Sequence, residues 1–152
     1  MTSTAAILFL VIGSLAAQPD VPTVPDSALS IGGISLGAEE AAVTAKLGQP
    51  TRRLETGDFL NLELRFPGIT VWLGQGSRVG EILSTSPKHC TSEGACPGQA
   101  WKRVEALYGT PLVADREDGR YMEYYPQSDF PCWLQFAVES GRVRSIRSEC
   151  QP

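Results

Sequence analysis

Few residues in this chain have a type and spacing that could support chemistry. Its one histidine, His89, could act as a general base, but no partner for it is identifiable. Grouped carboxylates could cleave a glycosidic bond or bind calcium, but here they fall in turns between strand-like segments, where acidic side chains are usually solvated. We therefore predict no catalytic residue, no metal site and no cofactor. The grouped carboxylates are Glu55 and Asp58 in the first half of the chain and Asp115, Glu117 and Asp118 in the second.

The sequence also lacks the motifs of common enzyme classes. It has no Gly-x-Ser-x-Gly turn to present a nucleophilic serine, and no glycine-rich phosphate loop. We therefore predict a protein that is not an enzyme. Two alternatives stay open: a binder of a small molecule or metal ion in a groove, and a hydrolase that acts on cell-wall material through His89 or the turn carboxylates.

The first 30 residues differ from the rest of the chain. Residues 1–17 contain an uncharged, mostly apolar stretch that ends in small side chains, which is typical of a secretory signal peptide, although no Lys or Arg precedes it. The stretch is short for a transmembrane helix. Residues 18–30 hold three prolines and no apolar period, which predicts a flexible linker. The mature chain is expected to be periplasmic or secreted, without stable insertion in a membrane.

The four cysteines favour disulfide bonds. An even number of cysteines in an exported chain usually pairs, and three pairings are possible here. The local pairing is favoured, because Cys90 and Cys96 enclose a short loop rich in small residues and Cys132 and Cys150 connect two late segments. A four-cysteine zinc site would need Cys-x-x-Cys spacing, which is missing.

The charge of the chain argues against nucleic acid as a partner. The 13 Lys and Arg residues face 17 Asp and Glu, which gives a net charge of −4. A mildly acidic protein gains little from contacts with a phosphate backbone.

The rest of the chain contains two similar sequence motifs, VTAKLGQP at 43–50 and VEALYGTP at 104–111. Each closes a segment of helix-forming residues, 38–47 and 99–108, with a glycine and then a proline. A glycine there suits the left-handed turn after a helix, and the proline prevents the helix from restarting. These motifs therefore predict two helices that end at Gly48 and Gly109.

Each predicted helix is followed by strand-like segments in which apolar and polar residues alternate. Period two of this kind indicates an antiparallel sheet with one covered face. We therefore predict an α+β protein of two tandem helix-plus-sheet repeats, at 31–89 and 90–152. The strand-like segments lie at 51–55, 61–66, 69–73 and 79–85, and then at 112–116, 120–125, 132–139 and 142–149.

Aromatic residues are the best candidates for a binding site. Trp72 and Trp133 precede Leu73 and Leu134 at the same offset of the repeat, so each tryptophan should point to the face opposite the leucines. Exposed aromatic side chains on a rigid sheet are efficient anchors for a protein partner. The alternative is ordinary packing beneath the helices. The candidate partner-binding residues are Trp72, Trp133, Tyr121, Tyr124 and Tyr125.

The combination of a Ser-Leu-Gly start, a Leu-Gly-x-Pro helix end, a Trp-Leu strand and a late Val-x-x-Ile resembles the repeat of β-lactamase inhibitory protein. It is also similar to the outer-membrane domain called BamE or SmpA/OmlA, although this chain lacks the lipoprotein cysteine. The resemblance implies a curved sheet with helices on one face that grips another protein. It therefore favours an exported, non-enzymatic domain that binds an exported or envelope protein.

Overall fold

The protein has an α+β fold, with two helices and a nine-stranded mixed open sheet among residues 20–151, the part that the structure, a computed structural model, describes. Short 3₁₀ turns η1 (Asp26–Leu29) and η2 (Gln75–Ser77) complete it. The helices are α1 (Glu40–Leu47) and α2 (Trp101–Tyr108), and the strands are β1 (Thr23–Val24), β2 (Arg52–Glu55), β3 (Leu62–Phe66), β4 (Ile69–Leu73), β5 (Val79–Ser84), β6 (Leu112–Arg116), β7 (Gly119–Pro126), β8 (Cys132–Glu139) and β9 (Arg142–Cys150).

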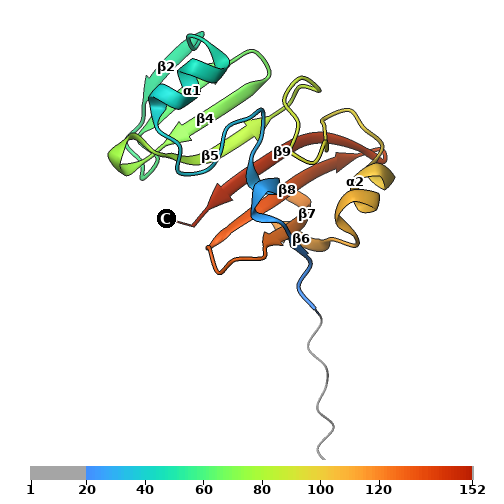
Figure 1. The fold of residues 1–152 in the computed structure, drawn as a ribbon. Helices are drawn as coiled ribbons and strands as arrows, with labels where there is room; N and C mark the ends of the chain where they lie inside the picture. The colour runs from blue at the N-terminus through green and yellow to red at the C-terminus, as the bar shows by residue number, and fades with distance from the viewer. Residues whose placement is uncertain (1–19, 152) are drawn as a thin grey trace, which may run out of the picture.

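The strands form two antiparallel meanders that join along one edge. The order is β1-β7-β8-β9-β5-β4-β3-β2, with β6 also paired to β7. Figure 1 shows the two meanders side by side, meeting where β5 runs next to β9. The sheet is mixed because β1 runs parallel to β7. The predicted helices and the eight predicted strand-like segments are confirmed within two residues at each end.

Both helices cover the same side of the sheet. On that side the register from β3 to β8 passes through five fully buried residues: Leu64, Val71, Ile82, Ser148 and Leu134. Val43 of α1 and Val104 of α2 are fully buried in the same core, as are the rings of α2's neighbours Tyr124 and Phe136. Because side chains alternate along a strand, the residues between these lie on a side that no helix of the described chain covers.

Both helices end at the predicted glycines, although not in the left-handed helical conformation expected there. Gly48 has φ 82° and ψ −161°, and Gly109 has φ 81° and ψ −164°. This combination is essentially restricted to glycine, because a side chain would clash with the backbone. Each glycine N–H donates to a carbonyl four residues earlier, Thr44 and Glu105 respectively, so it also closes the last helical turn.

The predicted flexible linker at 18–30 is wrong over its second half. β1 and η1 lie there, and Val24, Ala28 and Leu29 are buried. The prolines suggested a flexible linker, but proline is also tolerated in an edge strand and in a turn, which this segment forms. The predicted signal peptide at 1–17 lies outside the described residues.

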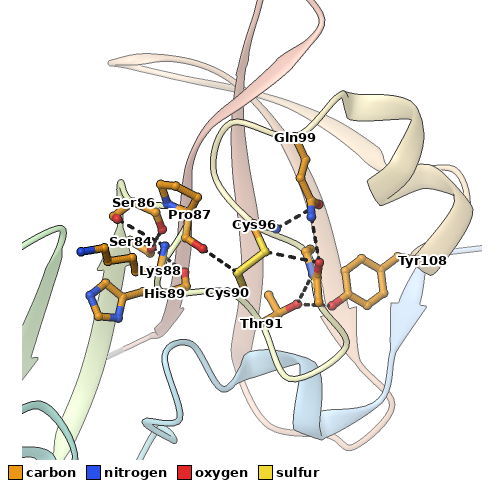
Figure 2. The surroundings of a disulfide bond; sticks show 12 residues. Ser84, Ser86, Pro87, Lys88, His89, Cys90, Thr91, Cys96, Gln99 and Tyr108 are labelled. Atoms are coloured by element: carbon orange, nitrogen blue, oxygen red, sulfur yellow. Dashed lines mark hydrogen bonds between the residues drawn. A yellow bond between two sulfur atoms is a disulfide. The ribbon is translucent and has the colours of Figure 1, made fainter.

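Two disulfides connect the cysteines in the pairing that local spacing favoured, Cys90–Cys96 and Cys132–Cys150. Figure 2 shows that the first closes the loop between the two meanders, where Thr91 is hydrogen-bonded to the Tyr108 hydroxyl of α2 at 2.7 Å. Such bonds persist in oxidising compartments and therefore indicate an extracytoplasmic location. Within residues 20–151, no helix has the length and apolar character needed to cross a bilayer.

Candidate functional site

A single row of aromatic and acidic residues crosses the side of the sheet that the helices leave uncovered. The register places Glu63 of β3 opposite Trp72 of β4, then Glu81 of β5, Glu149 of β9 and Trp133 of β8. We call this the acid–aromatic row. β4 and β8 are three strands apart, so the two tryptophan backbones are separated by about 14 Å. The two carboxylates of β5 and β9 lie between them.

A cavity of about 430 Å³ lies over the row. Trp72 and Trp133, both partly buried, line it, and the loop between β2 and β3 contributes Asp58 and Phe59. Phe59 is 60% exposed, so an aromatic side chain is held in solvent beside the tryptophans. The lining contains the four carboxylates of Asp58, Glu63, Glu81 and Glu149, and no lysine or arginine.

The three glutamates of the row differ in how they are paired. Glu63 accepts from Arg65 and, at 3.2 Å, from the Trp72 indole N–H. Glu81 is paired with Arg147. Glu149 has no ion-pair or side-chain hydrogen-bond partner among residues 20–151. The central strand pair therefore presents one carboxylate without a direct partner in the cavity, attracted from a distance by Arg116.

The crowding of acids changes the titration of Glu81. Burial raises the pKa of this carboxyl, and although the Arg147 guanidinium opposes the shift, the negative charges of Glu149 and Glu63 add to it. A carboxyl with a pKa raised on folding stabilises the protein only at low pH and loses that contribution as the pH rises past its folded pKa. The ionised form of Glu81 is therefore less favourable in the folded protein than in solvent.

A second network holds Trp133. Glu123 of β7 is fully buried and accepts three hydrogen bonds from Arg116, one of 3.0 Å and two of 2.8 Å. It also accepts one from Gln135 at 2.8 Å and one from the Tyr125 hydroxyl at 3.1 Å. The Arg116 guanidinium carbon lies 5.9 Å from the centre of the Trp133 ring. This arrangement is within the range of a cation–π contact. The β6–β7 hairpin thereby positions the tryptophan.

The predicted tyrosines divide between the two sides of the sheet. Tyr121 and Tyr125 are partly buried on the uncovered side, where alternation required at least one of Tyr124 and Tyr125 to lie. Tyr121 donates to Asp118 at 2.8 Å and lines a different cavity with Arg144 and Arg147. Tyr124 is a correction: it is fully buried under α2, with its hydroxyl donating to the Gly109 carbonyl at 2.7 Å, and cannot contact a partner.

The residues considered for catalysis do not converge. The His89 ring nitrogen is 3.0 Å from the Pro67 carbonyl oxygen, a contact that ties a loop to a turn. Asp115 is paired with Arg120 on an exposed surface at 2.8 Å. Of the grouped carboxylates, Asp58 lines the tryptophan cavity and Asp118 the other one. Within the described residues, no three His, Cys, Asp or Glu side chains are arranged to hold a metal ion.

The sequence did not identify the glutamates of the row, Phe59 or the Arg116–Glu123 pair. Alternation does place Glu63 between two buried leucines and hence on the outer side. Nothing local, however, brings Glu81 next to Glu149, because that contact depends on the pairing of β5 with β9.

Comparison with known proteins addresses the fold. No family model matches the chain, and no curated protein matches it. Solved structures of bacterial proteins share its fold. An extracellular protein containing an SCP domain from Bacillus anthracis has a TM-score of 0.54 at 12% identity, covering 93% of this chain and 50% of that one. A cysteine-rich secretory protein from Staphylococcus aureus has a TM-score of 0.59 at 13% identity, covering 87% and 51%.

A third structure, a DUF4309 family protein (YjgB) from Bacillus subtilis, has a TM-score of 0.53 at 13% identity, covering 78% of this chain and 83% of that one. This chain thus spans about half the length of the first two proteins. These similarities correct the resemblance to β-lactamase inhibitory protein and BamE, which is wrong. The resemblance depended on two short motifs, the glycine at the helix end and the Trp-Leu pair in a strand. Such motifs follow general rules of secondary structure and therefore occur in unrelated families.

Proposed function

We propose that this chain is an exported, periplasmic or secreted, domain that binds another protein through the uncovered side of its sheet. The observation that supports this most is the pair Trp72 and Trp133 on that side, with a cavity between them and Phe59 at its rim. Aromatic side chains bury large areas at low entropic cost, which makes them the usual centres of protein interfaces. The rigid sheet supplies the preorganisation that such anchors need.

We propose further that the site binds and does not catalyse. A pair of catalytic carboxylates needs one member ready to give a proton and one ready to take it. Glu63 and Glu81 are instead each paired with an arginine, Arg65 and Arg147, and in Glu81 the attraction of Arg147 opposes the rise in pKa that burial causes. Of the two acids of the cavity without an arginine partner in the described chain, Asp58 lies on an exposed loop and Glu149 lies in the middle of the row, opposite Glu81.

The test is replacement of both tryptophans. The double variant Trp72→Ala/Trp133→Ala is expected to bind a partner from the native extracellular fraction at least about 30-fold more weakly, because truncating such an anchor costs about 2 kcal/mol or more. Capture on immobilised protein followed by titration with the purified partner measures this.

The matched control is Phe130→Ala, which removes an aromatic ring that is 66% exposed and lines a different cavity, next to η1. It should leave capture unchanged. Equal recovery by the wild type and the tryptophan double variant would show that the proposal is wrong. If instead a metabolite raises the melting temperature of the wild type and not of the double variant, the site belongs to a small-molecule binder.

We also infer that the two halves are copies of one unit. Several contacts occur in both: the Gly37 and Gly98 N–H groups donate to Val79 and Val143 at 2.7 Å, and Arg78 and Arg142 donate to the carbonyls of the same two glycines at 3.0 and 2.9 Å. The tryptophans are not equivalent in this comparison. Bulges at Trp72/Leu73 and Ala137/Val138 align Trp72 with Ala137, so their shared offset in sequence is a coincidence.

The repeat proposal predicts equal effects at the two helix stops. Gly48→Ala and Gly109→Ala should each lower the free energy of unfolding by about 1–3 kcal/mol, because alanine is strained in this region of φ and ψ. Space does not limit either change, since an added Cβ meets nothing within 4 Å at either glycine. Urea unfolding measures both, and Gly57→Ala, at a glycine without a positive φ and with equally open space, is the control. A loss at only one helix would argue against equivalence.

A further inference from the structure

We propose that the cavity between Trp72 and Trp133 receives an arginine or lysine side chain from an extended, basic segment of the partner protein. This rests on the proposed function and adds the chemistry of the partner. It is carried by the charge of the cavity, by its aromatic walls and by the position of one unpaired carboxylate.

The cavity is electrostatically one-sided. Its lining includes Asp58, Glu63, Glu81 and Glu149 and no cationic side chain. Arg65 and Arg147 form ion pairs with Glu63 and Glu81. The negative charges of Asp58 and Glu149 are left without a paired cation among residues 20–151. Burial and repulsion from Glu149 and Glu63 raise the pKa of Glu81 even with Arg147 beside it. A partly enclosed site with excess negative charge attracts a cation more strongly than solvated acids do, because the local dielectric is lower.

The walls suit a cation on a long aliphatic stem. The tryptophans stand at the two ends of the acid–aromatic row, about 14 Å apart, and Phe59 adds an exposed ring at the rim. Aromatic faces attract guanidinium and ammonium groups and also cover the methylenes that carry them. The volume of about 430 Å³ is larger than one side chain needs, so neighbouring backbone of an extended segment would enter as well.

Glu149 is the group expected to pair with the incoming cation. It lies in the middle of the row, opposite both Glu81 and Trp133, and no side chain of residues 20–151 is hydrogen-bonded to it.

The neighbouring cavity on the same side gives the segment a direction. It is lined by Arg144 and Arg147, both paired with carboxylates, and by Asp118, so it lacks the excess negative charge that would attract a basic chain. The segment is therefore expected to run from the tryptophan cavity toward the β2–β3 loop, where Asp58 and Phe59 lie, and not toward β7.

The experiment uses the folded, disulfide-bonded protein and the probe peptide acetyl-Gly-Ser-Arg-Ser-Gly-amide. The indole N–H signals of the protein are followed by NMR. Trp101 serves as an internal reference, because it packs against Phe136 on the helix-covered side of the sheet. The peptide should shift the Trp72 and Trp133 signals in a saturable way and leave Trp101 unchanged. The lysine version should bind similarly. A version with citrulline, which has the shape of arginine without its charge, should bind roughly 10-fold more weakly or not at all.

Two charge variants complete the design. Glu149→Gln should weaken binding of the arginine peptide roughly 10-fold. Glu139→Gln removes the same charge from an exposed pair with Arg144, away from the cavity, and should leave binding unchanged. Equal binding of the citrulline peptide, equal loss in both variants, or no saturable shift at Trp72 and Trp133 would each overturn the inference. Free cadaverine binding as tightly as the peptide would overturn the assignment to a protein segment.

The two proposals can fail separately. If capture of the partner depends on the tryptophans but the basic peptides do not bind, the proposed function stands and this inference falls. If the peptides bind the cavity but the tryptophan double variant still captures the partner as the wild type does, the proposal that the partner binds through this side of the sheet falls.

Discussion

Replacing Phe136 with alanine is expected to lower the free energy of unfolding by about 3–5 kcal/mol, the range for removing a large buried aromatic side chain. Phe136 is fully buried at the point where α2 meets the sheet. Its ring centre lies 5.6 Å from Trp101, 6.3 Å from Tyr108 and 6.0 Å from Tyr124. The truncation therefore leaves a cavity bordered by three rings that cannot easily collapse into it.

Urea unfolding at neutral pH measures the effect, and near-ultraviolet circular dichroism reports whether the ring cluster loosens. Phe59→Ala is the matched control, since it removes the same ring from a loop position that is 60% exposed and should cost about 0.5 kcal/mol. A loss below about 1 kcal/mol for Phe136→Ala would contradict the packing of α2 on the second meander.

Replacing Arg116 with methionine is the second large effect. The change keeps aliphatic contact with Trp133 but removes the guanidinium, which pairs with both carboxylate oxygens of Glu123 through two of its nitrogens. Glu123 is fully buried, while the Arg116 side chain is 44% exposed. Leaving a buried carboxylate without its cation usually costs about 3–5 kcal/mol, and we expect the low end because Gln135 and Tyr125 still donate to it.

Two comparisons make this expectation specific. Arg120→Met breaks an ion pair with Asp115 in which both side chains are mostly exposed, and should cost less than about 1 kcal/mol. In a Glu123→Gln background, Arg116→Met should cost much less than in the wild type, because the stranded charge is gone. Similar small losses in Arg116→Met and Arg120→Met would mean that water reaches Glu123.

Much of the fold follows from local rules that the sequence displays. The stops at Gly48 and Gly109 were predictable because only glycine tolerates the required dihedral angles, and proline two residues later forbids continuation. The strands were predictable because one covered face demands alternation. The linker prediction failed at Val24, because the burial of a two-residue edge strand depends on its pairing with β7 and leaves no periodic signal.

The candidate site was only partly predictable. Alternation put Trp72 and Trp133 on the side away from the leucines, and it required one of Tyr124 and Tyr125 to share that side without saying which. Burial of Tyr124 under α2 resolves this. Short sequence motifs also suggested the wrong family, because glycine helix ends and Trp-Leu strands are common to many folds.

By itself, the sequence determined the helices, the strands and the side of the sheet to which most side chains point, since these depend on dihedral preferences and on a period of two. It also indicated which cysteines pair, because a short loop brings its own ends together. Only the tertiary structure decided that β5 pairs with β9. That pairing joins residues far apart in the chain, Glu81 with Glu149 and thereby Trp72 with Trp133. Long-range strand pairing is selected by the burial of the whole core, so the acidic, aromatic cavity exists only once both meanders have folded together.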